Sequence, residues 1–282
     1  LTRLIFDLEN TKKRTVAIYG DLPISGDKTQ RLPPWTILET IKRFFSVQIL
    51  FGEVQRFSSK IDVLVLTEPG ELSKTTLYAI DQFILRGGRV LAFLDPFNET
   101  LDVSQNSQPS VPRSRGLDNF TKLLSAWGIE IPQRTVVGDL GGAINVQMTR
   151  NDRILATKYP VWFDVKEGGF VSDEVITSGL SRISLRSAGY IKHSPQQSLK
   201  FQPILLASRE SGFIDVSKIE YAPNPVEILA NLQQTTEQKV LMARLSGAFK
   251  TAFPGGAPVA NVNSENNLPH LNDSLKPSAV LL

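Results

Sequence analysis

The chain has 282 residues, of which 41% are hydrophobic and 21% charged, values typical of a globular protein. It contains no cysteine, which excludes disulfides, thiolate catalysis and thiolate metal sites. The net charge is +3, but the basic residues are scattered, so we expect no nucleic-acid-binding patch. The longest apolar run, Val90 to Leu94, is far shorter than the ~20 residues that span a bilayer.

The first half of the sequence alternates between apolar segments and segments with helical spacing. A helix is expected over residues 35–45, and a second one from the N-cap Ser73 to Gly87, which can take the left-handed conformation that ends helices. Strands apolar on both faces are typical of parallel sheets covered by helices. The expected fold class is therefore α/β, a doubly wound and mostly parallel sheet. Its strands are expected at residues 15–19, 47–51, 61–66 and 89–94.

The second half has a weaker and more β-rich pattern. A helix is expected at 117–127, and strands at 134–138, 203–208 and 239–247. We expect an α/β core over residues 1–150 and a β-rich continuation over 151–282, packed on the same domain and truncated at its C-terminus. The sequence does not begin with Met and stops on the strand-like "KPSAVLL". We therefore expect a fragment of a longer protein, whose missing parts could hold a membrane anchor or a targeting segment.

Four polar residues near the ends of two predicted strands are candidate binding residues. Glu68 follows the third strand, Asp95 follows the fourth, and Asn98 and Glu99 come just after it. Open α/β sheets bind ligands at the carboxyl edge of their strands. A carboxylate pair there could serve in acid–base chemistry or hold a metal. The alternative is that Glu68 belongs to a turn and that Asp95 accepts backbone hydrogen bonds in an Asp-Pro turn.

Other motifs give little support to catalysis. The chain has no G-x-S-x-G elbow, no Walker motif, no H-E-x-x-H pattern and no EF-hand, so no cofactor and no metal site are expected. "GDLGG" at residues 138–142 is expected to be a flexible loop. The aromatic cluster "KYPVWF" at residues 158–163 could be an exposed patch for a partner or part of a second core, and we favour the core.

Residues 77–96, "LYAIDQFILRGGRVLAFLDP", resemble the signature of the auxiliary components of gliding-motility-type ABC transport systems. The similarity continues through "LLSAWGIEI", "SAGYI" and "ARLSGAFKTAFP", so it covers most of the chain with the motifs in order. The resemblance implies a protein at the periplasmic face of the inner membrane, anchored through segments missing here, with an ABC permease and ATPase as partners. It also implies a fold similar to class I glutamine amidotransferases, a doubly wound, flavodoxin-like sheet.

Amidotransferase-like folds use a cysteine nucleophile activated by a histidine, and this chain has no cysteine. We therefore expect a non-catalytic domain that binds a partner subunit, a polymer or a small ligand. One alternative is a hydrolase that uses Glu68 and Asp95 at the carboxyl edge of the sheet, and another is a purely structural scaffold without a ligand. The polar segment 98–115 is too long for an ordinary connection, and we expect it to be poorly packed and to dock a partner.

Overall fold

The computed structural model describes residues 13–26, 31–99, 115–150, 153–172, 174–195, 198–221, 223–258 and 268–282. The chain divides into two compact units. The first unit contains Leu1–Phe93 and Ala248–Val280, and the second contains Leu94–Gly247 and Leu281–Leu282. The division expected at residue 150 stays a prediction. Within the described ranges, no helix is long and apolar enough to cross a membrane.

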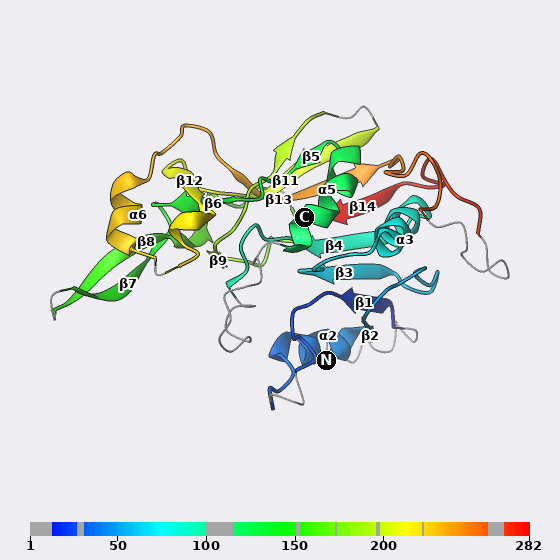
Figure 1. Cartoon of the computed structure of the whole chain (residues 1–282), viewed down its shortest axis with the longest axis horizontal. Coiled ribbons are helices and arrows are strands. Elements are labelled where there is room, and N and C mark those ends of the chain that lie inside the picture. Colours follow the sequence, from blue (N-terminus) through cyan, green and yellow to red (C-terminus); the bar gives the residue numbers. More distant parts are fainter. Residues whose placement is uncertain are drawn as a thin grey trace. The chain divides into compact units, whose positions relative to one another are not determined.

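The first unit is built on parallel strands (Figure 1). β1 (Thr15–Tyr19) lies between β2 (Ser46–Leu50) and β3 (Val63–Thr67), and β3 also pairs with β4 (Arg89–Phe93), all in parallel. A later strand, β14 (Ser278–Leu281), lies next to β4 in the sheet. The predicted parallel sheet of the four early segments is therefore confirmed.

Two helices connect these strands. α2 (Thr36–Phe44) lies between β1 and β2 along the chain, and α3 (Lys74–Leu85) lies between β3 and β4. The hydroxyl of Ser73 accepts a hydrogen bond from the backbone N–H of Thr76, as expected of an N-cap. Gly87 follows the end of α3 with φ of 89°, in the left-handed region that favours glycine. Both ends of the second helix were thus predicted correctly.

Both faces of β1 and β3 are buried, whereas β2 is only partly covered. On one face, Val16, Ile18 and Val65 pack with Leu38 of α2. Since side chains alternate along a strand, the other face carries residues that are buried too, namely Ala17, Leu64, Leu66, Val90 and Ala92. The steps from β1 to β2 and from β3 to β4 run in opposite directions along the sheet. Right-handed crossovers therefore place α2 and α3 on opposite faces, as doubly wound sheets require.

The second unit is β-rich, and its strands pair in antiparallel fashion. The pairs are β5 with β10, β6 with β12, and β11 with β13, and a three-stranded sheet has the order β7-β8-β9. The strands are β5 (Ile129–Glu130), β6 (Thr135–Asp139), β7 (Ala143–Arg150), β8 (Arg153–Lys166), β9 (Arg182–Arg186), β10 (Lys192–His193), β11 (Leu199–Leu206), β12 (Ser211–Asp215) and β13 (Val240–Gly247). The helical elements are α5 (Arg115–Ala126), η1 (Val216–Lys218) and α6 (Pro225–Asn231).

The aromatic cluster at 158–163 lies on β8 and belongs to the core, as predicted. Tyr159, Val161 and Phe163 alternate along the strand and are all buried. Tyr159 and Val161 pack with Ile214 and Val216, whereas Phe163 belongs to a neighbouring cluster. The three-stranded sheet that contains β8 was not predicted, because the first half of β8 is exposed and polar residues interrupt its apolar pattern.

Candidate functional sites

Glu68 lies at the carboxyl end of β3 in the first unit. It is only 3% exposed, and its φ of 48° is unusual for a residue with a side chain. Its backbone N–H donates to the carbonyl of Phe93 at 3.1 Å, and its carbonyl accepts from the N–H of Asp21 at 3.0 Å. Glu68 therefore belongs to a tight turn tied to the ends of the neighbouring strands, as one of the two sequence interpretations proposed.

Asp21 is a carboxylate at this edge that sequence reasoning missed. It comes two residues after β1, and burial raises the pKa of its carboxyl. Gly70 has φ of 59°, and a Cβ there would lie 2.0 Å from Asp21 Oδ2, so a larger residue would strain the backbone and displace this carboxylate. Asp21 could have been found from the sequence, because it follows β1 much as Glu68 follows the adjacent parallel strand β3.

The other three predicted residues lie together at the start of the second unit. Glu99 accepts hydrogen bonds from the indole N–H of Trp162, at 2.9 Å to Oε1 and 3.2 Å to Oε2. Its Oε1 also accepts a short hydrogen bond from the hydroxyl of Ser187, which is fully buried. Asn98 is only 5% exposed. The carboxylate of Glu99 thus joins β8 to the turn after β9.

The electrostatics of this region centre on Asp95. Burial raises the pKa of Asp95 to about 7, and the negative charge of Glu99 adds to the rise. Burial, and then the charge of Glu99, also raise the pKa of Tyr159 above its usual value. Near neutral pH the carboxyl of Asp95 can therefore be present in either protonation state. The described residues contain no cluster of three or more His, Asp or Glu side chains suited to a metal ion.

The helix α3, which carries the signature "YAIDQF", holds a distant part of the first unit through buried polar contacts. Asp81 is 1% exposed, and its Oδ1 accepts from the N–H of Ala252 at 2.8 Å. Its Oδ2 accepts from the hydroxyl of Thr251 at 2.7 Å. Gln82 donates to the carbonyl of Leu271 and accepts from its N–H, both at 2.9 Å. These polar residues of the signature therefore have a structural role, which is to fix the segment that precedes β14.

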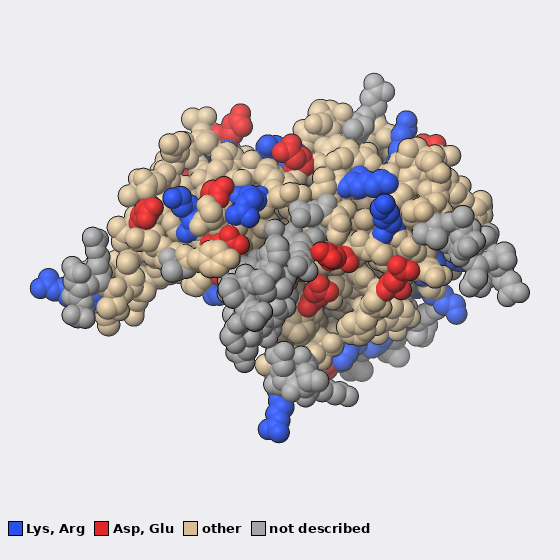
Figure 2. Space-filling model, viewed as in Figure 1, with Lys and Arg blue, Asp and Glu red and all other residues tan. Residues whose placement is uncertain are grey.

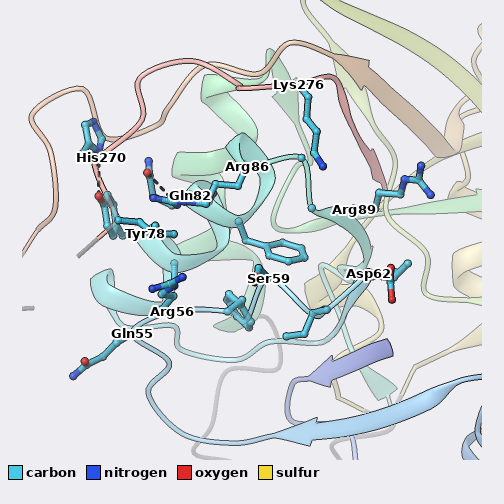
Figure 3. Close-up of a pocket in the computed structure, with 18 of the residues that line it drawn as sticks. Gln55, Arg56, Ser59, Asp62, Tyr78, Gln82, Arg86, Arg89, His270 and Lys276 are labelled. Carbon is cyan, nitrogen blue, oxygen red and sulfur yellow. Dashed lines mark hydrogen bonds between the residues drawn. The ribbon is translucent and has the colours of Figure 1, made fainter. Parts of the chain in front are cut away.

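A cavity of about 830 Å³ lies at the opposite, amino edge of the same strands (Figure 3). Its lining includes Arg14, which precedes β1, and Arg89, the first residue of β4. Phe83 of α3 lines the cavity, and Gly87 and Gly88, the glycine pair of the signature, also form part of its wall. Sequence reasoning placed candidate residues only at the carboxyl edge and missed this cavity, because its lining comes from loops without a recognisable motif.

On the face shown in Figure 2, Lys and Arg side chains are interspersed with Asp and Glu. This agrees with the scattered charges of the sequence. The predicted docking segment 98–115 could not be compared with the structure, since residues 100–114 lie outside the described residues.

A family model described as "ABC-type uncharacterized transport system" matches residues 13–282. None of the curated proteins compared with the chain matches it. The family match extends through both compact units and includes the signature helix, the cavity and the residues around Glu99.

Proposed function

We propose a non-catalytic binding role for this chain, which belongs to the ABC-type transport system auxiliary family. In this role it acts at the periplasmic face of the inner membrane, beside an ABC permease and ATPase. The observation that carries the proposal is the family match over residues 13–282. The gliding-motility type and an amidotransferase-like fold of the first unit are parts of the same proposal, supported by the signature at 77–96 and by the doubly wound strands.

The non-catalytic part of the proposal is supported by how the expected carboxylates are used. The carboxylate of Glu99 is bonded to Trp162 and Ser187, which fixes it within the second unit. Glu68 is buried in a turn. The sequence has no cysteine to act as the nucleophile of an amidotransferase-like site. A carboxylate bonded as that of Glu99 is stabilises the fold and is poorly placed to transfer a proton to a substrate.

A hydrolase remains the second candidate, and the observation that favours it concerns Asp95. A carboxyl with a pKa of about 7 is suited to general acid–base catalysis at neutral pH. Perturbed carboxyls also occur at purely structural positions. Turnover assays with glutamine, generic esters and peptides distinguish the two candidates. We expect no turnover, and activity that is lost in Asp95→Asn would establish the hydrolase instead.

The transport role is tested with the full-length protein in its native membrane. We expect it to co-purify with a permease and an ATPase subunit after mild detergent extraction. The matched variants replace residues 100–114, which leaves Asn98 and Glu99 in place, or residues 259–267, by Gly-Ser linkers as long as the segment removed. Loss of co-purification only in the first variant supports docking through 100–114. Absence of both subunits from the purified wild-type protein would refute the transport role.

A further inference from the structure

The described residues that line the amino-edge cavity all belong to the first unit, and their charge is strongly one-sided. Among the described residues that line it, the cationic side chains are Arg14, Arg56, Arg86, Arg89 and Lys276, and the only carboxylate is that of Asp62. The Oδ2 of Asp62 accepts the backbone N–H of Thr15 at 2.7 Å. The cavity therefore concentrates positive charge in a protein whose basic residues are otherwise scattered.

The hydrogen bonds of Arg86 go to uncharged acceptors. Its guanidinium donates to the carbonyl of Gln82 at 2.9 Å and to the carbonyl of Pro269 at 2.8 Å. Burial lowers the pKa of Arg86. The negative charges of Tyr78 and Asp81 oppose this change, whereas the positive charge of Arg56 adds to it. In the described part of the chain, Arg89 and Lys276 have no ion-pair partner. An anion in the cavity would relieve this repulsion.

The cavity also has an apolar wall. The rings of Phe57 and Phe83 lie 5.7 Å apart at 59°, and both residues are buried apart from the surface that they give to the cavity. Ile61 and Ala79 extend this wall. A site with both an apolar wall and several cations suits a molecule that carries an anionic group on a ring or hydrocarbon part.

The glycine pair of the signature is required for this shape. A Cβ on Gly87 would lie 2.1 Å from the Lys276 side chain, and one on Gly88 would lie 2.4 Å from the Phe83 ring. Larger residues would therefore displace the lysine and the phenylalanine from their positions in the cavity wall. Figure 3 shows Lys276 extending from the segment before β14 toward the cavity.

We propose that this cavity binds a small anionic molecule, which the positive charges of Arg56, Arg86 and Lys276 attract and whose apolar part lies on Phe57 and Phe83. Guanidinium groups match both phosphate and carboxylate groups, because their paired N–H donors fit two oxygens at once. A volume of about 830 Å³ is within the range of cavities that hold small molecules. Binding to the isolated chain does not depend on the proposed association with a permease.

The test is calorimetric titration of the chain with 1-naphthyl phosphate, 1-naphthoate, neutral 1-naphthol and inorganic phosphate. At least one of the two naphthyl anions should bind more tightly than 1-naphthol and than inorganic phosphate, and its binding should weaken as salt is added. Whichever anion binds more tightly identifies the group that the site prefers. Binding of 1-naphthol as tight as that of both anions, or no binding of either anion, would overturn the proposal.

Single substitutions in the cavity lining test whether the anion binds there. Lys276→Gln and Arg56→Gln should each weaken binding of the preferred anion about tenfold, because each removes a positive charge from the cavity wall. The control is Lys74→Gln at the start of α3, which lies outside the cavity lining and should leave affinity unchanged. Both changed cavity residues are exposed, so the variants should keep the wild-type unfolding temperature. Equal affinity in the three variants would place the anion elsewhere and refute the site.

Discussion

The contacts of Asp81 predict a large loss of stability when this side chain is truncated. In Asp81→Ala the buried N–H of Ala252 loses its acceptor, which costs about 1–3 kcal/mol. The hydroxyl of Thr251 loses a second hydrogen bond of about 0.5–1.5 kcal/mol. The change also removes a carboxylate whose burial raises its pKa, and this offsets part of the loss. We expect the free energy of unfolding to fall by about 2–4 kcal/mol.

Asp81→Asn should cost less, about 1–2 kcal/mol, because an amide oxygen can still accept from Ala252. Its NH₂ group then faces the side-chain NH₂ of Gln82, which donates to Asp81 Oδ2 at 3.0 Å in the wild type. Urea unfolding followed by far-UV circular dichroism gives the free energies. Hydrogen exchange at Ala252 tests the local cause, since its amide should exchange faster in Asp81→Ala.

The matched control is Glu39→Gln on α2, whose carboxylate forms an exposed ion pair with Lys42 at 2.9 Å. Exposed pairs contribute little, so we expect a change below about 0.5 kcal/mol. If Asp81→Ala changed the stability no more than this control and left exchange at Ala252 unchanged, the structural role assigned to the signature helix would be wrong.

Asp95, Glu99 and Gly88 each allow a separate measurement. The folded-state pKa of Asp95, about 7, lies above its unfolded value, so the folded wild type binds this proton more tightly and loses stability as pH rises toward 7. Asn cannot ionise, so Asp95→Asn should gain stability relative to wild type as pH rises from about 4 to about 7, and a constant difference over this range would contradict this. Glu99→Gln should lower the pKa of Asp95 in an NMR titration, and an unchanged value would show that their charges do not interact. Gly88→Ala would place its Cβ 2.4 Å from the Phe83 ring, so a loss of about 1–3 kcal/mol is expected in urea unfolding. The control Gly255→Ala meets nothing within 4 Å and should change stability by less than about 0.5 kcal/mol, and equal effects of the two would refute the clash.

The sequence alone determined the parallel strands of the first unit and the limits of α3. The strands at 61–66 and 89–94 are apolar on both faces, and this pattern indicates a buried parallel strand whatever its partners are. The ends of α3 follow from local chemistry, because a hydroxyl at Ser73 caps the first turn and Gly87 tolerates a positive φ. Such signals depend on a few neighbouring residues and can be read directly from the sequence.

The sequence places Glu68 and Asp95 at strand ends, but it does not show which residues bond to the nearby Glu99. Trp162 and Ser187, which bond to Glu99, lie 63 and 88 residues later in the chain. These contacts form only when β8 and the turn after β9 come together in the second unit, and no local pattern encodes them.

The polar residues of the signature show the same limit. "YAIDQF" predicts a helix, but its Asp and Gln were not expected to be buried, because charged and amide side chains usually face solvent. The tertiary structure supplies Thr251, Ala252 and Leu271, which lie at least 170 residues later and satisfy the buried side chains of Asp81 and Gln82. The amino-edge cavity likewise exists only once loops from distant parts of the first unit meet. Local periodicity thus fixed the strands and helices, whereas hydrogen bonds and charges between residues far apart in the sequence required the folded chain.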